Sequence, residues 1–559
     1  MWVANNVADS LPLFLVVNLC LLVLGTQAGC VLDAYKLVQM DIDGSPLGSR
    51  SVRLSQYANM HMEGVKLYRS VVVIPFSQAT DQIVKDLVSE KNGISGMLFV
   101  LPSNFDNGAL DDEDRANFMA IEKYLAEVSI PFPVYFTVET EDLQRMVKEI
   151  ERDIKKGKPG SSAKGGYMMV VKGTEAKPVK GSQIINFEGW LPGSEGARPG
   201  ASKDPTVVIT AHYDTFTAAP GLAFSSGSNG SGTLALLSLV RMFGRLYSSD
   251  EGLRPRHNIL FLLTGGGKLD SAGLKFWLKT ANSRLLDSIE LVISLDSLSG
   301  WGTEKSGDLY LHHSKPRAKD ETAAAWYDRF AGAATQEGVT LHQAQKKINL
   351  GLPYVPWEHE HVAQQKMLAV TLSGRSKGVP PSESTSVLDR MNSVNLTAVA
   401  RASRIVAEAV GMRLFPDKDG DVHVFKEGST FDASLPFLQR WLETLDSNPR
   451  MAPFFSAKSP VGVAILRLLN DHTKGTVDAF HMEERYKFYD GQKYVLTVFK
   501  TAGAMFDMVF LAAWSFYLVF LYVVLKVVTQ GWDELFAGFR PRPTKWKNGQ
   551  KGYGKGGKR

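Results

Sequence analysis

Three polar segments in the middle of the chain carry residue types that metal chemistry uses. His212-x-Asp214 follows the aliphatic run VVITA, and Asp296 follows the run ELVISL. Histidine and aspartate at such positions are typical zinc ligands in hydrolases. The loops between them, at 225–232 and 264–273, offer serine, glycine and asparagine where further carboxylates would be needed. The region therefore has the layout of a metal site but lacks much of its chemistry.

The runs around these residues predict an α/β domain. VVITAHYDT, NILFLLTGGG and ELVISLDSLSG each place β-branched or aliphatic residues before a short polar or glycine-rich loop, and residues 232–247 have a broad apolar face at helical spacing. Further elements are predicted as strands at 307–313 and 367–373 and as helices at 321–338 and 397–412. In such domains the functional loops lie at the carboxyl ends of parallel strands, where His212 and Asp296 stand.

The length of 559 residues predicts two or three domains. Residues 30–179 alternate strand-like and helix-like runs and are assigned to a smaller lumenal α/β lobe. The larger lobe with the His-x-Asp motif covers 180–415, and residues 416–504 are assigned to a membrane-proximal lumenal segment. The stretch 155–166 is rich in Lys, Gly and Ser, which predicts an exposed loop or lobe boundary.

Both ends of the chain carry targeting or membrane signals. Residues 1–29 have a short apolar core followed by small residues, which fits a secretory signal peptide; since no Lys or Arg precedes Lys36, an uncleaved anchor is the alternative. Residues 508–525 form an uncharged apolar run that would be about 27 Å long as a helix. We therefore predict a transmembrane helix at 505–528, followed by a tail at 529–559.

The distribution of charge predicts the topology. Residues 530–559 hold eight Lys/Arg and two Asp/Glu, so the tail carries a charge of +6. Since the net charge of the whole chain is +5, the rest of the chain has a charge near −1. By the positive-inside rule the tail is cytosolic and the body lumenal, in a single-pass type I arrangement. A nearly neutral body gives no support for nucleic-acid binding. The two cysteines, Cys20 and Cys30, leave no internal disulfide if the signal peptide is removed.

The order of these motifs resembles that of the co-catalytic di-zinc aminopeptidases. That family places His-x-Asp after one strand, a bridging Asp in the next loop, Glu-Glu after a second strand, Leu-Asp after a third, and a late His. His212, Asp214 and Asp296 match this pattern. The resemblance implies an aminopeptidase-like three-layer αβα lobe, accompanied here by the smaller α/β lobe and one C-terminal transmembrane helix.

The remaining positions depart from the family pattern. The bridging Asp falls on Ser228, and the Glu-Glu pair falls on Gly266 and Gly267. No histidine occurs between residues 361 and 423, where the late His should follow its strand. A hydroxyl and two hydrogens cannot replace three carboxylates as metal ligands and general base. We therefore expect a degenerate site with no catalytic residue, no bound metal and no other cofactor.

The surviving ligands need another explanation. We expect His212 and Asp296 to be residual structural residues satisfied by hydrogen bonds, with a single weakly held ion as the alternative. Residues 357–361, WEHEH, are interpreted as a solvated or hydrogen-bonding loop. The alternative is a relocated metal site, because His359 and His361 would share a face if the segment were extended.

Two sequons become meaningful if the body is lumenal. Asn395-Leu-Thr397 and Asn229-Gly-Ser231 fit the glycosylation pattern, and the second lies inside the degenerate loop. Asn395 and Asn229 are therefore the candidate glycosylation sites.

The whole arrangement resembles the nicastrin/nicalin family. The segments HYDT, GSNGSG, TGGGKLDSAG and SLDSLSG carry most of this resemblance, which covers essentially the whole chain. It implies an endoplasmic reticulum membrane glycoprotein without peptidase activity. It also implies three partners: the nodal modulator protein, a small multipass membrane protein, and the Sec translocon with its associated biogenesis factors.

We therefore expect a non-catalytic scaffold subunit acting beside the translocon in multipass membrane protein biogenesis. It would bind partners through its lumenal body and its membrane helix, where the small residues Ala512, Ala513 and Ser515 mark a possible contact face. Two alternatives remain at this point. One is an active metallo-aminopeptidase with relocated ligands, and the other is a nicastrin-like substrate receptor for an intramembrane protease.

Overall fold

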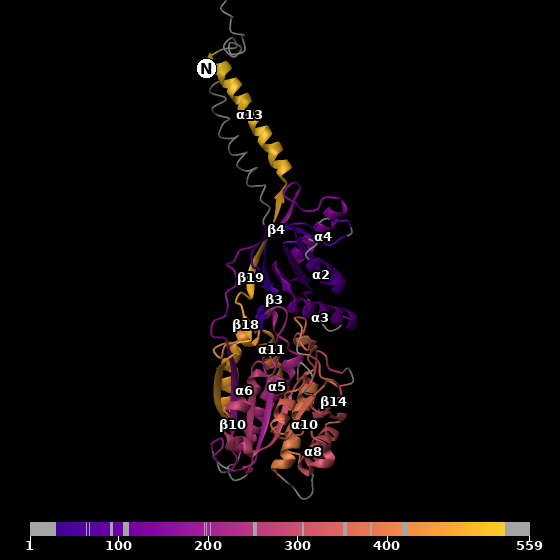
Figure 1. The fold of residues 1–559 in the computed structure, drawn as a ribbon, viewed down its shortest axis with the longest axis vertical. Helices are drawn as coiled ribbons and strands as arrows, with labels where there is room; N and C mark the ends of the chain where they lie inside the picture. The colour runs from indigo at the N-terminus through magenta and orange to yellow at the C-terminus, as the bar shows by residue number, and fades with distance from the viewer. Residues whose placement is uncertain are drawn as a thin grey trace, which may run out of the picture.

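Two lobes are stacked along the long axis of the molecule, and the C-terminal described helix projects from the smaller one (Figure 1). The computed structural model describes residues 29–530, apart from gaps at 63, 66, 90–92, 104–110, 195, 197, 202, 250–253, 305–306, 350, 352–354, 381–382 and 416–422. The predicted signal peptide and cytosolic tail lie outside these residues. Gly29, the first described residue, adjoins Val498 and Phe499.

The larger lobe is built on an eight-stranded sheet in the order β15-β14-β16-β13-β11-β12-β10-β17. Its inner strands β12, β11, β13 and β16 are parallel, whereas β10 and β17 extend one side in antiparallel register. The strands are β10 (Gln183–Leu191), β11 (Thr206–His212), β12 (Asn258–Thr264), β13 (Ile289–Leu295), β14 (Leu309–His313), β15 (Leu341–Gln345), β16 (Ala369–Ser373) and β17 (Lys474–His481). The β11, β12 and β16 strands are buried throughout, which explains their continuous apolar runs.

Helices cover both faces of this sheet. One face carries α5 (Ser228–Ser249), α8 (Glu321–Gln336), α10 (Leu396–Leu414), α11 (Leu435–Asp446) and α12 (Pro460–His472) in a single large core. The other face carries α6 (Ala272–Thr280), α7 (Ser283–Ser288) and α9 (Glu358–Gln364). Helix α5 is apolar on nearly every side because it lies between the sheet and the helices α10, α11 and α12. The predicted three-layer αβα lobe is confirmed.

The smaller lobe is a closed barrel with helices packed on it. Its strand order is β1-β19-β9-β4-β5-β6-β8, where β8 pairs back to β1. The strands are β1 (Cys30–Lys36), β4 (Leu54–Asn59), β5 (Val71–Pro75), β6 (Gly96–Leu101), β8 (Val134–Val138), β9 (Gly165–Val171) and β19 (Lys493–Ala502). Helices α2 (Asp81–Val88) and α3 (Asp112–Glu127) pack in one cluster and α4 (Glu141–Lys155) in another. The predicted smaller α/β lobe is present.

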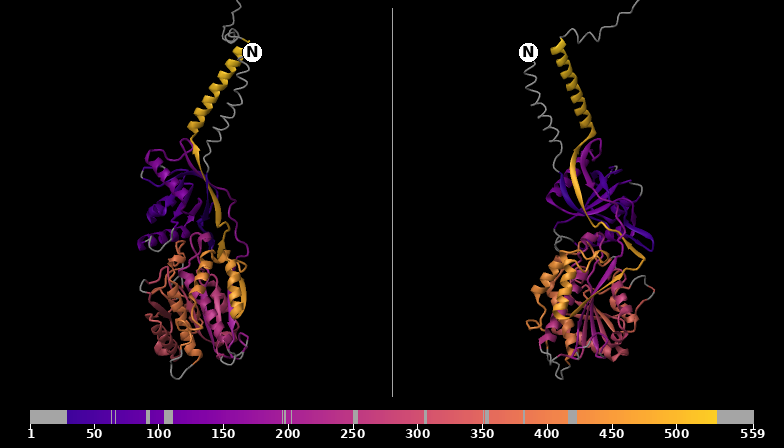
Figure 2. Two further views of the ribbon diagram at one scale, coloured as in Figure 1. Left: turned by 180° about the vertical axis from the view of Figure 1, so that it is seen from behind. Right: turned by 90° about the vertical axis from the view of Figure 1, so that its left-hand side faces the viewer.

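The segment assigned to residues 416–504 is not a separate membrane-proximal unit. Helices α11 and α12 and strand β17 belong to the larger lobe, which is the lobe farther from the projecting helix (Figure 2). Strand β18 (Tyr486–Phe488) then joins a small sheet with β2 (Gln39–Ile42), β3 (Ser45–Ser49) and β7 (Ser129–Ile130), and β19 completes the barrel. The chain therefore returns to its first lobe before it reaches the helix.

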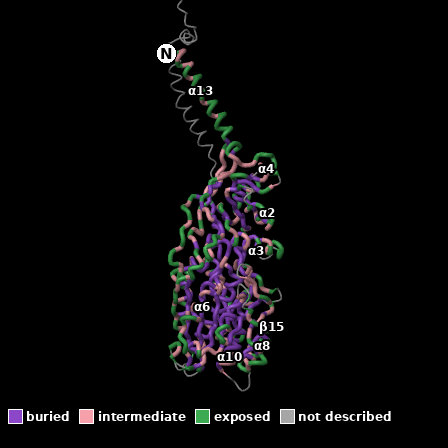
Figure 3. Tube along the Cα trace, in the orientation of Figure 1, coloured by how far each residue is buried: buried purple, intermediate pink, exposed green. Residues whose placement is uncertain are grey.

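The projecting helix α13 (Ala504–Gln530) follows β19 directly. The Ala504 N–H donates to the Ser162 carbonyl at 2.9 Å. A Cβ on Gly503 would lie 2.4 Å from the Ala163 carbonyl oxygen, so only glycine allows this close approach. Residues 504–529 are long and apolar enough to cross a membrane, and none of their most apolar window is buried in the protein (Figure 3).

Glu122 links the two lobes from inside their shared core. It lies on α3, is buried, and accepts hydrogen bonds from the Ser386 hydroxyl and from the Val387 N–H, the latter at 3.0 Å. Burial raises the pKa of Glu122 to about 7, although both hydrogen bonds oppose the shift. The neutral carboxyl is therefore the form that the folded interface favours.

Replacing Glu122 by Gln should flatten the pH dependence of stability. The pKa of Glu122 is about 7 in the folded protein and 4.5 in the unfolded chain. As the pH rises from 4.5 to about 7, Glu122 ionises in the unfolded chain but stays neutral in the folded protein, so the free energy of unfolding falls. The loss is on the order of 3 kcal/mol at most. Urea unfolding of the full chain in detergent between these pH values should show this decline, and Glu122→Gln should reduce it. Glu127→Gln, an exposed change on the same helix, is the control; equal slopes for all three proteins would contradict the assignment.

Candidate functional site

The predicted ligands meet at the carboxyl edge of the large sheet. His212 ends β11, Asp214 follows it, and Asp296 follows β13. All three side chains are buried. The Gly267 N–H donates to Asp214 Oδ1 at 2.9 Å, and the Ser297 hydroxyl donates to Asp296 Oδ1 at 2.9 Å. The two carboxylates are therefore held by neighbouring loop residues.

His212 is held by a carboxylate that the sequence did not indicate. Its Nδ1 lies 3.4 Å from Glu358 Oε1, and Glu358 comes from the start of α9. Glu358 also accepts hydrogen bonds from the Ser294 hydroxyl at 2.8 Å and the Thr264 hydroxyl at 3.3 Å. Neither ring nitrogen of His212 makes a hydrogen bond of good geometry, so the expectation that hydrogen bonds satisfy it is wrong. The contact is an ion pair.

The charges around His212 favour its protonated form. Burial and the nearby Lys268 both lower the pKa of His212, but the Glu358 and Asp296 carboxylates outweigh them, and the pKa is raised. For Glu358, burial raises the pKa, whereas the adjacent His212 lowers it and gives a net lowering. Both directions agree with an imidazolium–carboxylate pair.

Lys268 places a second positive charge in the same region. Burial lowers the pKa of this half-buried lysine, while Asp296, Asp214 and Glu358 act in the opposite direction. For Asp296, burial raises the pKa, but Lys268, followed by His212, lowers it to give a net lowering. Side chains of the protein thus supply positive charge at the edge where the family pattern places metal ions.

Ser228, at the position of the bridging carboxylate, is engaged elsewhere. Its backbone N–H and its hydroxyl both donate to Asp389 Oδ2 at 2.9 Å, and the Gly227 N–H donates to Asp389 Oδ1 at 2.8 Å. Asp389 is fully buried and caps the start of α5, where a carboxylate is favoured by the free N–H groups and the helix dipole. The Ser228 hydroxyl therefore donates to the carboxylate that caps the N-terminus of α5.

The two glycines at the Glu-Glu positions leave no room for side chains. A Cβ on Gly267 would lie 2.4 Å from Cγ of His212, so the imidazole blocks the path of any side chain there. Gly266 has φ +69°, a conformation that side-chain-bearing residues rarely adopt. The backbone of this loop therefore does not accept the two carboxylate side chains of a Glu-Glu pair.

The residues present do not fit a di-zinc centre. His212 is paired with Glu358, the bridging position is turned to Asp389, and the side chain of His212 blocks position 267. Within the described ranges, no cluster of three or more His, Cys, Asp or Glu side chains is arranged to hold a metal ion. The arrangement is one ion pair, His212–Glu358, surrounded by hydrogen-bonded carboxylates.

The segment 357–361 is not a solvated loop. Residues 358–361 form the start of α9, and all four side chains are buried. His359 Nδ1 lies 2.8 Å from the Thr371 hydroxyl oxygen, and burial lowers the pKa of His359 to about 3. His361 Nε2 lies 3.6 Å from Asp270 Oδ1. Residues two apart on a helix do not share a face, so His359 and His361 do not form the proposed relocated metal site.

The two sequons differ in accessibility. Asn229 is buried inside α5, and its amide donates to the Asp214 carbonyl, so the folded protein has no space for a glycan there. Asn395 is exposed, and its side-chain oxygen caps α10 by accepting from the N–H groups of Thr397 and Ala398. The prediction of Asn229 as a glycosylation site is therefore wrong, whereas Asn395 stays a candidate.

Arg450 is a second buried group that the sequence did not indicate. It is fully buried and donates to three backbone carbonyls, those of Tyr213 at 3.0 Å, Phe224 at 2.6 Å and Leu445 at 2.5 Å. Burial lowers the pKa of Arg450 to about 10, although Asp446 opposes the shift. It ties the loop after β11 to the α11 segment; nothing in the local pattern around residue 450 signals this contact.

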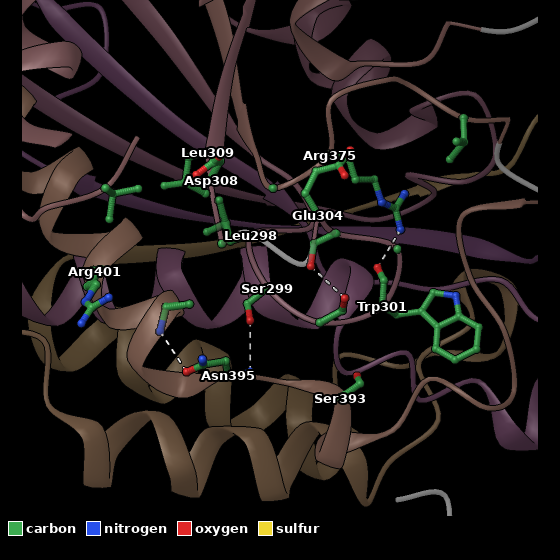
Figure 4. A pocket seen from close by; sticks show the side chains of 18 of the residues that line it. Leu298, Ser299, Trp301, Glu304, Asp308, Leu309, Arg375, Ser393, Asn395 and Arg401 are labelled. Atoms are coloured by element: carbon green, nitrogen blue, oxygen red, sulfur yellow. Dashed lines mark hydrogen bonds between the residues drawn. The ribbon is translucent and has the colours of Figure 1, made fainter. Parts of the chain in front are cut away.

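A cavity of about 1000 Å³ lies between the lobes (Figure 4). It is bounded by α3 of the smaller lobe and by loops that follow β13 and β16. Arg375 donates to the carbonyls of Trp301 at 3.2 Å and Ser384 at 3.0 Å, and the Ser376 hydroxyl donates to Glu304. The charged groups on its wall include both signs and several are already paired, so the cavity has no single chemical preference.

Fold and site together define a protein with an aminopeptidase-like scaffold, in which His212 at the carboxyl edge of the sheet is paired with Glu358. A family model described as peptidase family M28 matches residues 196–410. The crystal structure of the gamma-secretase component nicastrin superposes with a TM-score of 0.58 at 11% identity, over 84% of this chain and 99% of nicastrin, which shows a shared fold.

Sequence comparison gives the narrower grouping. The chain is 28% identical to the human BOS complex subunit NCLN over 88% of each chain. It is 26% identical to nicalin of Caenorhabditis elegans, over 71% of this chain and 72% of that protein. The chain is thus similar over most of its length to nicalin and to BOS complex subunit NCLN, and it shares its fold with nicastrin.

Restoring a carboxylate at residue 267 should damage the fold and should not recover a metal site. Gly267→Glu places a side chain against the His212 ring, so we expect a loss of several kcal/mol of stability. The full chain in detergent would be followed by thermal unfolding and by zinc content. Gly332→Glu is the matched control, because its Cβ meets nothing within 4 Å. A stable Gly267→Glu protein that binds stoichiometric zinc would contradict the conclusion that these residues do not fit a metal centre.

Proposed function

We propose that this protein is a non-catalytic scaffold subunit of an endoplasmic reticulum membrane complex that acts beside the Sec translocon in multipass membrane protein biogenesis. The observation that carries the proposal is the filled sheet edge: His212 and Glu358 form an ion pair there, and the positive charge of Lys268 acts on the same carboxylates, at the edge where a peptidase would hold its metals. An aminopeptidase needs an open metal position and a general base. A body that keeps the fold without these parts is suited to binding.

The proposed partners follow from the family. The human relative is named as a subunit of the BOS complex. We propose that this chain likewise binds the nodal modulator protein and a small multipass membrane protein, and that the complex associates with the Sec translocon. The folded body would bind the nodal modulator protein or other partners through its surface. Helix α13 would bind membrane partners through side chains that are not buried in this protein.

The proposed location is the endoplasmic reticulum membrane in a single-pass type I arrangement. The basic residues after α13 support a cytosolic C-terminus. The exposed Asn395 sequon is compatible with a lumenal body.

The two competing functions have less support. An active peptidase would need His359 and His361 on one metal, and their contacts point them to Thr371 and Asp270 instead. A receptor for free amino ends would need an unpaired carboxylate in the site. Glu358 is already engaged with His212 and Ser294, and no specific contact favours this role over a scaffold.

Metal content and peptide hydrolysis test the absence of catalysis. The purified full chain should contain no stoichiometric zinc by inductively coupled plasma mass spectrometry, and it should not hydrolyse aminoacyl substrates beyond the background of a matched empty preparation. The same sample should be assayed after incubation with excess zinc, since a metal lost during purification would return. Two zinc ions per chain with turnover would refute the scaffold proposal.

Association through α13 has a separate test. Ala512 and Ser515 are three residues apart, so they lie on one face of the helix, and small side chains let another helix approach closely. The double change Ala512→Leu and Ser515→Leu should lower the recovery of co-purifying membrane proteins from digitonin extracts severalfold. Leu521→Phe lies on the opposite face and should not. Equal recovery for both variants would leave α13 as an anchor only.

A further inference from the structure

The segment 155–166, called the 155–166 loop, runs from the last residue of α4 to the first two residues of β9, and it is fixed at the level where α13 begins. The Ser162 carbonyl accepts the N–H of Ala504, and Ser161 exchanges two backbone hydrogen bonds with Gly165 at 3.1 and 2.7 Å. Asn59 holds the other side, since it donates to the Gly160 carbonyl at 3.1 Å and accepts its N–H at 2.8 Å. The loop is therefore attached to the barrel on two sides and beside the first turn of the helix.

Its position relative to a bilayer follows from the helix rise. The charge-free run of α13 starts at Met508, four residues after Ala504. At about 1.5 Å per residue this separates the loop contact from the hydrocarbon boundary by roughly 6 Å. The headgroup region on each side of a bilayer is about 5–8 Å thick. The loop thus lies at headgroup depth on the side of the folded body.

The charge of the loop is positive throughout. Lys155, Lys156, Lys158 and Lys164 are all exposed, and residues 155–166 contain no Asp or Glu. Lys155 is paired with Glu151 at 2.6 Å, and Lys164 donates to the Gly157 carbonyl at 2.9 Å, which folds the loop on itself.

Exposed apolar side chains lie at the start of α13, beside the lysine-rich loop. Met505 and Phe506, in the first turn of α13, are 70% and 63% exposed. Lysines next to exposed apolar side chains at a helix end match the way proteins meet the phosphates and the acyl chains of one leaflet.

We propose that the 155–166 loop is a lipid-headgroup contact that binds the phosphates of the leaflet facing the folded body, with Lys156 and Lys158 as its main cationic groups. The inference goes beyond a scaffold role and requires only that α13 crosses the membrane. The contact would hold the barrel against the membrane surface, and binding should strengthen when anionic lipid is present.

Spin-label accessibility in nanodiscs measures this contact. The full chain would carry Cys20→Ser and Cys30→Ser with a nitroxide at Ser162→Cys, because Ser162 is exposed and contributes only its backbone to the α13 contact. Nanodiscs would contain phosphatidylcholine with or without phosphatidylserine. We expect severalfold lower collision with a water-soluble nickel reagent at 162 than at a reference label at Ala318→Cys, with the larger difference in anionic lipid.

Charge reversal separates lysine binding from simple proximity. Lys156→Glu with Lys158→Glu should raise nickel accessibility at 162 toward the reference level, and added NaCl should have a similar effect. Lys279→Glu with Lys319→Glu makes the same charge change on exposed positions of the larger lobe and should have no effect. A label at 162 that is as water-accessible as the reference in both lipids would overturn the proposal.

Two further outcomes also decide the matter. A label at Val519→Cys, inside α13, should be accessible to oxygen and not to nickel; if it is open to nickel, α13 does not span the bilayer and the headgroup proposal fails with it. If Val519 is protected but 162 is protected only in preparations that retain a protein partner, the loop binds protein and the lipid assignment is wrong.

Discussion

Burial of several carboxylates at one sheet edge is the constraint around which the larger lobe is arranged. Asp214, Asp296 and Glu358 are buried together, and leaving such charges uncompensated costs several kcal/mol each. In a di-zinc enzyme the metal ions supply the balancing charge. Here His212 and Lys268 supply positive charge from within the chain: burial raises the pKa of Asp296, but Lys268, followed by His212, lowers it to give a net lowering.

Buried backbone groups at this sheet edge also need partners, and distant segments of the chain supply them. Asp389 caps α5, and Arg450 satisfies three carbonyls of the surrounding loops. Both groups are fully buried and both act on backbone atoms that would otherwise be unpaired. The edge is thus stabilised by contacts to backbone as well as by ion pairs, and the glycines at 266 and 267 fit that arrangement.

The sequence predicted those parts of the fold whose signal is local. The strands β5, β6, β11, β12 and β13 are mostly apolar because they are mostly buried, and α5 and α10 follow the helical period. Strand β19 was missed because only Leu496 and Val498 in it are buried and because it pairs with β1, more than 400 residues earlier. The segment 357–361, WEHEH, contains two glutamates and two histidines, and five such residues are too few to show a helical period. The sequence therefore did not distinguish helix α9 from a loop.

The candidate site shows the same division. The positions of His212, Asp214, Ser228, Gly266, Gly267 and Asp296 follow from motif order, because each is adjacent to a strand end or helix start. Their partners do not: Glu358 meets His212 across 146 positions of sequence, and Asp389 meets Ser228 across 161. Such pairings depend on the three-dimensional sheet order, and a single sequence holds no local trace of them.

The closure of the barrel by β19 has a consequence for biosynthesis. Strand β19 lies between β1 and β9, so the lobe that contains the first described residues cannot complete its sheet until residues 493–502 have been made. The larger lobe, which needs nothing after β17, can fold first. Lobe completion and release of α13 into the membrane then fall at nearly the same moment of synthesis. A chain that stalls before this point would expose an open barrel edge. Exposed strand edges promote aggregation and are bound by quality-control factors.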